Sequence, residues 1–211
     1  MSVAAGDRVA ILGMDAVSAE VLVNLLTGST LPDAGGVTVF GRSTSEIADS
    51  ADWLAVVDRF GIVSERSVLL EGLQVVQNLA IPFTLDIEPV SADVRSRAEQ
   101  LAREVGLDAA RWDAAVATLD VVDRMRIRLG RALALDPRVL LLEHVSAGFS
   151  PGDAVRLGAD IGALAERRGV AIVAATSDEA FARAVARRVL RWEPATGRLA
   201  ERRGWFGRRL G

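Results

Sequence analysis

Short apolar runs alternate with stretches of helical periodicity along most of the chain. The run Val139–Glu143 is apolar on both faces, which is typical of a central strand in a parallel sheet. Glycine, proline and aspartate turns bound several of the other runs, as they often bound strands. We therefore expect strands at Arg8–Gly13, Val37–Gly41, Arg59–Val63, Val139–Glu143, Val170–Ala175 and Val189–Trp192, the last of these being the final strand.

Helical periodicity fills most of the intervals between these strands. We expect helices at Ala19–Leu26, Thr44–Val57, Ser91–Val105, Leu119–Leu135, Pro151–Arg168 and Asp178–Arg187. Strands that alternate with helices predict an α/β domain with a mostly parallel sheet flanked by helices. Residues 67–131 are helix-rich, hold no convincing strand and are interrupted at Pro82 and Pro89. We interpret them as a helical subdomain inserted into a single domain that spans residues 1–211.

Composition narrows the classes of partner and compartment. The net charge of −3 and the pI of about 5.3 argue against a nucleic-acid partner, which usually needs a basic surface. Cysteine is absent, which excludes disulfides and thiolate metal ligands. No apolar run has the length of a membrane span, and Met1–Gly6 lacks the features of a secretory signal. We expect a cytoplasmic protein, in contact with the inner face of the cell membrane if it has a membrane partner.

Arginine is the sole basic residue type, because all 25 lysine or arginine positions hold arginine. Any mechanism that needs a lysine of this chain is therefore excluded. Arginines also flank Trp205 and Phe206 in the segment 202–209 near the C-terminus. This segment is either a solvated basic end or a contact for anionic lipid or a partner protein.

Several segments of the chain, taken in order, match short motifs of a known family. They are Gly6–Gly13, Leu22–Gly28 with Leu31–Gly41, Leu69–Leu79 and Arg131–Leu142. In order and spacing they resemble parts of the ABC transporter ATPase family: the strand before the phosphate loop, the next helix and hairpin, the segment after the Q-loop, and the signature helix that leads into the Walker B strand. The resemblance extends from Gly6 to Leu199 and implies a P-loop NTPase-like fold.

The resemblance also implies partners. In that family this domain dimerises head-to-tail and holds a coupling helix of a membrane subunit near the Q-loop and the helical subdomain. We therefore expect a dimer, with an ABC permease subunit, another nucleotide-binding subunit, or both, as partners. The apolar segment Leu69–Phe83 either contributes to such a groove or is ordinary subdomain core.

The phosphate-loop pattern of the family is G-x-x-x-x-G-K-[ST], in which lysine and backbone N–H groups hold phosphate and the hydroxyl residue holds Mg²⁺. The aligned residues are Gly13, Met14, Asp15, Ala16, Val17, Ser18, Ala19 and Glu20. Gly13 is kept, but alanine replaces the lysine and glutamate replaces the hydroxyl residue. Because ATP is strongly anionic, the lost cation and the nearby carboxylates predict a repulsion larger than the attraction of the helix dipole.

The signature loop of the family, L-S-G-G-Q, closes over the phosphate bound by a partner subunit. The aligned residues are Leu119, Asp120, Val121, Val122 and Asp123. Two β-branched residues replace the glycines and hinder a close approach of the backbone. Two carboxylates add further repulsion toward phosphate.

Other nucleotide-facing positions of the family align with different residue types. Glu65 takes the place of the Q-loop glutamine and is either a metal ligand or an exposed loop acid. Glu143 takes the place of the Walker B aspartate and is the one candidate metal ligand that keeps its chemistry. His144 takes the place of the catalytic glutamate and is either a replacement general base or a polar residue at a former site. Ser177 takes the place of the switch histidine.

These substitutions favour a catalytically silent ATPase-like subunit with a structural or regulatory role and no cofactor. One alternative is an active ATPase that binds ATP and Mg²⁺ and works through Glu143 and His144. Another is a module that binds a different ligand in the altered pocket.

Overall fold

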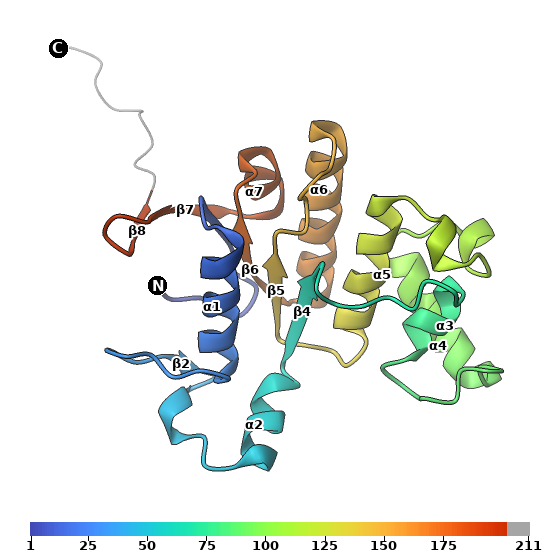
Figure 1. Ribbon diagram of the computed structural model, residues 1–211, viewed down its shortest axis with the longest axis horizontal. Coiled ribbons are helices and arrows are strands. Elements are labelled where there is room, and N and C mark those ends of the chain that lie inside the picture. Colours follow the sequence, from blue (N-terminus) through green and yellow to red (C-terminus); the bar gives the residue numbers. More distant parts are fainter. Residues whose placement is uncertain (202–211) are drawn as a thin grey trace.

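A mostly parallel sheet runs through the middle of the molecule, in a computed structural model that describes residues 1–201 (Figure 1). Its six strands lie in the order β4-β5-β6-β1-β7-β8, and all neighbours are parallel except β7 and β8. The strands are β1 (Arg8–Leu12), β4 (Phe60–Ser64), β5 (Val139–Glu143), β6 (Ala171–Thr176), β7 (Arg188–Glu193) and β8 (Arg198–Glu201). The expectation of an α/β fold with a mostly parallel sheet is confirmed, and β5 is an interior strand as predicted.

Helices cover both faces of this sheet. One face packs against α6 (Pro151–Arg168) and α7 (Glu179–Val185), where Leu140 and Ile172 meet Leu157 and Phe181 in one buried cluster. The other face packs against α1 (Ala16–Thr27), which contributes Ala19 and Val23 to a second cluster. Strands buried on both sides read as continuous apolar runs, which is why β5 and β6 were evident in the sequence.

The remaining helices form the side of the molecule beyond β4 and the end below it (Figure 1). They are α2 (Ser50–Val57), α3 (Val75–Ala80), α4 (Ala92–Glu104) and α5 (Val121–Leu133). Within residues 1–201, the interval between β4 and β5 contains helices and isolated bridges but no named strand. Helix α5 lies so close to β4 that a Cβ at Gly61 would clash with the carbonyl of Ala132, so glycine permits this packing.

Some predicted elements have different bounds. The predicted strand Val37–Gly41 is only β2 (Thr38–Val39), which pairs with β3 (Arg42–Ser43) in a separate hairpin, because Phe40 and Gly41 form its turn at positive φ. The predicted helix Thr44–Val57 is instead a 3₁₀ turn followed by α2. Asp49 starts α2 as its N-cap, because its side chain accepts the N–H groups of Ala51 and Asp52.

A strand missed by the sequence analysis lies at the sheet edge. Val189–Trp192 was expected to be the final strand, but β8 follows it after the turn at residues 194–197 and pairs antiparallel with β7. Its residues are mostly exposed, so they lack the apolar run that identified the interior strands. In the part of the chain covered here, no helix combines the length and apolar character needed to cross a membrane. The basic, aromatic segment 202–209 lies outside the described residues.

Candidate functional site

Several of the predicted site positions follow directly after the carboxyl ends of parallel strands, where ligands of open α/β sheets usually bind. Gly13 follows β1, His144 follows β5, and Ser177 follows β6. Backbone hydrogen bonds tie these loops together: the N–H of Gly13 donates to the carbonyl of Thr176 (2.9 Å), and that of His144 donates to Ala175 (3.0 Å). The structure thus brings these three sequence-predicted positions together at the carboxyl edge of the sheet, by which we mean the side where the parallel strands end. The amino edge is the opposite side, where these strands begin.

The phosphate-loop region is short because α1 begins at Ala16. Asp15 is its N-cap, and its side chain accepts the N–H of Ser18 at 2.7 Å. Residues 16–18, which the aligned pattern assigns to the phosphate loop, therefore form the first helical turn. The Ser18 N–H group lowers the pKa of Asp15, with a smaller lowering from the charge of nearby His144. A carboxylate of the chain itself thus uses an N–H group that an anion at this helix end would need.

Arg66 connects two of the predicted site residues. Its guanidinium lies 2.6 Å from Glu20 Oε1 and 2.6 Å from Glu143 Oε2. Glu143 is only 6% exposed, and its hydrogen bond is the main cause of the raised pKa of Arg66. Glu20 and Glu143 align with the residues that hold Mg²⁺ in the resembled family. In this structure the guanidinium of Arg66 joins these two carboxylates.

Sequence reasoning did not select Arg66. One feature of the sequence could have indicated it: Arg66 directly follows Glu65, and the two positions aligned with Mg²⁺ ligands, Glu20 and Glu143, are both acidic. Glu65 itself is exposed, and its carbonyl accepts a 3.4 Å hydrogen bond from Arg128. Among residues 1–201, its side chain forms no ion pair, so the structure does not join it to the Arg66 cluster.

His144 lies beside this cluster in an unusual backbone conformation, with φ of 48°. Its Nε2 atom is buried and has no hydrogen-bond partner in the described part of the chain, and the same holds for the hydroxyl of Ser146. Ser177 is exposed and precedes Asp178, which caps α7. Within the region that the structure describes, no group of three acidic or histidine residues could hold a metal ion.

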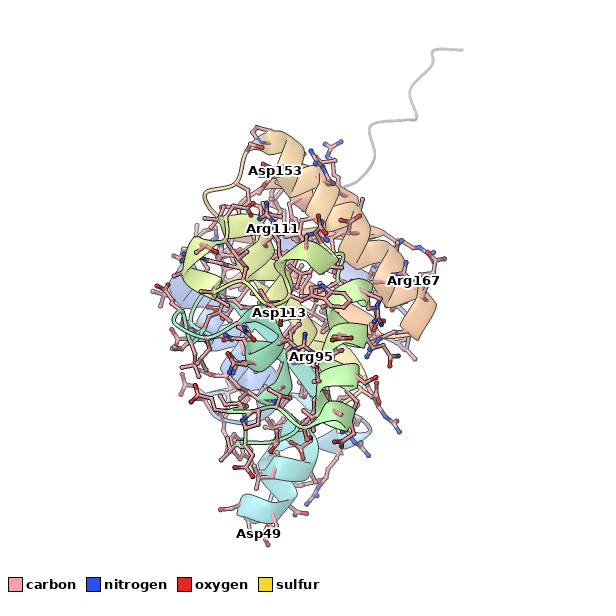
Figure 2. The ribbon with its side chains drawn as sticks, turned by 90° about the vertical axis from the view of Figure 1, so that its right-hand side faces the viewer. Asp49, Arg95, Arg111, Asp113, Asp153 and Arg167 are labelled. Atoms are coloured by element: carbon pink, nitrogen blue, oxygen red, sulfur yellow. The ribbon has the colours of Figure 1, made fainter. Side chains whose placement is uncertain are left out.

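The aligned signature loop begins α5 and is also self-capped. Asp120 accepts the N–H of Asp123 at 2.9 Å, and Arg111 lies 2.6 Å from Asp123 and 3.6 Å from Asp120. Burial, followed by the charge of Asp120, raises the pKa of Asp123. Leu119 is buried and Val121 is 58% exposed, while Val122 is partly buried. Figure 2 shows Arg111 toward the end of the molecule that carries Asp153, far from Asp49.

Arginines of α5 hold the loop that follows β4. Arg128 donates to the carbonyl of Ser67 (3.0 Å), Arg131 donates to that of Val68 (2.6 Å), and Arg124 pairs with Glu71 (3.1 Å). Burial lowers the pKa of Arg128 and of Arg131. The loop is thus fixed to the helix that the signature segment begins, and Val68 at its tip is 73% exposed.

Known proteins resemble this chain in sequence. The chain is 31% identical to the methionine import ATP-binding protein MetN of Caulobacter vibrioides over 189 residues, which are 90% of this chain and 56% of that protein. It is 29% identical to the lipoprotein-releasing system ATP-binding protein LolD of Chromohalobacter salexigens over 201 residues, which are 95% of this chain and 83% of that protein. The chain thus spans little more than half the length of MetN.

Solved structures share the fold. The structure of CbiO1 from Clostridium perfringens, part of the ABC transporter complex CbiONQ, matches with a TM-score of 0.75 at 20% identity, over 90% of this chain and 75% of that one. The ATP-binding cassette MJ0796, dimeric in a post-hydrolysis state with ADP and Pi, matches with a TM-score of 0.77 at 20% identity, over 97% of this chain and 89% of that one.

The family itself follows from the sequence. The sequence model of the family described as ABC transporter matches residues 1–145, from the N-terminus through β5 and the turn after it. This range includes the aligned phosphate loop, the Q-loop position and the signature helix. The chain belongs to the ABC transporter family.

Proposed function

We propose that this chain is a catalytically silent ATP-binding-subunit-like protein that serves as a structural or regulatory subunit of a transport complex. The observation that carries the proposal is the position of Arg66, 2.6 Å from both Glu20 and Glu143. A divalent cation between these carboxylates would meet a guanidinium already there. Displacing Arg66 would leave the buried Glu143 without its cation, which is costly in free energy.

The phosphate side of the site supports the same proposal. The chain has no lysine to place on a phosphate, and Asp15 already accepts the N–H of Ser18. The carboxylates of Asp15 and Glu20 would both lie near an incoming triphosphate, and like charges at close range repel. Since residues 16–18 are helical, a phosphate-binding loop would also require the first turn of α1 to unwind. We therefore propose that no nucleotide and no Mg²⁺ bind here.

The aligned signature residues at the start of α5 also support a structural or regulatory role. They argue against a subunit that lacks its own ATP site but completes that of its partner. In a head-to-tail dimer, this chain would lend the N-terminus of α5 to the ATP site of the other subunit. There Asp120 caps the helix and Val121 projects to 58% exposure. Carboxylates and β-branched residues at this end disfavour contact with a phosphate. We propose that neither the phosphate-loop side nor the signature side of this chain completes a shared ATP site.

The partners we propose follow from the relatives. MetN and LolD are ATP-binding proteins of transport systems, and MJ0796 is dimeric in two solved structures. We propose that this chain binds a membrane permease subunit, another nucleotide-binding subunit, or both, at the inner face of the cell membrane. The loop after β4, which exposes Val68 (73%) and Leu70 (44%), is the surface that we assign to the permease.

Hydrolysis by the purified chain tests this function. With Mg-ATP we expect phosphate release equal to that of a buffer control. Turnover that disappears in His144→Ala would contradict the proposal and support an active ATPase with a histidine base. Affinity capture from detergent-solubilised membranes should recover a permease, and Val68→Asp should abolish that recovery. Recovery that is unchanged by Val68→Asp would overturn the assignment of the permease surface.

A further inference from the structure

A cavity of about 670 Å³ lies at the opposite edge of the sheet from the candidate site. Its walls are the N-terminal segment 1–5, the β2–β3 hairpin, the C-terminal end of α1 and the amino ends of β4, β5 and β6. Figure 1 shows the hairpin next to the lower end of α1. The volume falls within the range of about 300–1,000 Å³ that small-molecule sites occupy. Nothing in the proposed transport role uses this cavity.

Apolar and polar surface both line the cavity, and aliphatic side chains form part of its wall. Leu26, Val39, Val139, Leu141 and Val173 contribute to it. Phe60 and Phe40 add an aromatic pair with ring centroids 5.1 Å apart. The aliphatic part of this wall offers apolar contact to an alkyl chain.

The backbone of the inner wall offers little to a polar ligand. The N–H of Val139 donates to the carbonyl of Arg59 (3.2 Å), and that of Ala171 donates to Arg138 (3.0 Å). These groups at the amino ends of β5 and β6 are therefore already paired.

Positive charge at the mouth is unbalanced. Arg138 lines the cavity, and Arg59 lies over the ring of Phe40 with its Cζ 5.0 Å from the centroid. Neither arginine forms an ion pair within residues 1–201, and no acidic side chain of that range lines the cavity. Aliphatic wall residues together with unpaired cations at the mouth complement an amphipathic anion.

We propose that this cavity binds a medium-chain fatty acid. The alkyl chain lies against the amino ends of β4, β5 and β6, and the carboxylate pairs with Arg138. The site is independent of the nucleotide region, because the two lie at opposite edges of the same sheet.

Displacement of a fluorescent fatty acid, dansylaminoundecanoate, from the full chain tests the proposal. Decanoate should displace the probe at about tenfold lower concentration than decanol, because decanol lacks the charge that Arg138 recognises. Failure of the probe to bind, or equal displacement by decanoate and decanol, would overturn the proposal. The second result would indicate a nonselective apolar groove.

Variants locate the site. Arg138→Gln should weaken decanoate about tenfold and leave decanol unchanged, whereas the control Arg198→Gln, at an exposed arginine of β8, should change neither. Thr38→Trp adds bulk at the exposed hairpin wall and should abolish binding of the probe. Binding retained in Thr38→Trp, or decanoate affinity unchanged by Arg138→Gln, would place the ligand elsewhere and contradict the proposal.

Discussion

The carboxyl and amino edges of the central sheet differ in whether their charged side chains are paired within the protein. At the carboxyl edge, Arg66 joins Glu20 to Glu143, and Asp15 is bound to the first turn of α1. At the amino edge, Arg138 and Arg59 form no ion pair within residues 1–201; Arg138 lines a partly apolar cavity, and Arg59 lies over Phe40 of its wall. Binding of a charged ligand is favoured where the protein leaves the opposite charge unpaired, because no internal pair must break first. We therefore expect the carboxyl edge to be the less receptive of the two to a charged ligand.

Rebuilding the phosphate loop should produce the largest change. The combined variant Asp15→Gly, Ser18→Gly, Ala19→Lys, Glu20→Ser and Arg66→Gln removes the internal cap and cation and supplies a lysine. Equilibrium binding of a fluorescent ATP analogue should strengthen by about 100-fold, since charge-assisted contacts contribute about 1.5–3 kcal/mol each. The same variant with Arg66 retained should gain less and lose its Mg²⁺ dependence. Equal affinity in wild type and both variants would show that these residues do not silence the site.

Removing Arg66 should destabilise the fold, whereas removing Arg138 should not. Arg66→Ala leaves Glu143, which is 6% exposed, without its cation. We expect a loss of about 1–2 kcal/mol in the free energy of unfolding, discounted because the guanidinium is half exposed. Urea denaturation at pH 7 measures this loss. Arg138→Ala is the matched control and should stay within about 0.5 kcal/mol of wild type.

A second substitution separates charge from packing in the Arg66 result. The double variant Arg66→Ala with Glu143→Gln removes the unpaired charge and should recover most of the lost stability. If Arg66→Ala is as stable as wild type, the bridge between Glu20 and Glu143 does not stabilise the carboxyl edge.

The smallest expected effect is the pH dependence of the Asp15 cap. Asp15→Asn keeps a side-chain oxygen for the N–H of Ser18 but removes the charge. The pKa of Asp15 lies below its ordinary value of 3.8 in the folded protein, so its charge adds stability above pH 3.8 that is lost as the pH falls through the folded-state pKa. Wild type should melt at a higher temperature than the variant at pH 7, and the gap should close in strong acid. The control Asp33→Asn, at an exposed loop acid, should show no such gap; a gap for Asp15→Asn that is constant with pH would rule out the charge effect.

Much of the scaffold could be predicted from the sequence because its signals are local. The buried runs of β1, β5 and β6 stand out, and α6 lies at the predicted Pro151–Arg168 because Ser150 caps its start and Gly169 adopts the left-handed conformation at its end. The exposed edge strand β8 and the short hairpin strand β2 have weaker patterns and were missed or overextended.

The candidate site was harder to predict because its interactions are not local. The predicted helix began at Ala19, because the aligned motif placed residues 13–18 before it and the capping power of Asp15 was overlooked, whereas α1 begins at Ala16. Arg66 reaches partners 46 and 77 positions away in the chain, which no pattern in one sequence reveals. The residue types at Ala19, Glu20 and Glu143 were evident in the sequence, but the cation that joins the two acids was not.

Calorimetric titration of the purified wild-type chain with Mg-ATP up to millimolar concentration tests the central claim most directly. We predict no heat beyond that of dilution, because the internal bridge of Arg66 and the cap of Asp15 already satisfy the groups that a Mg-nucleotide would need. A saturable signal with a micromolar dissociation constant would contradict the account.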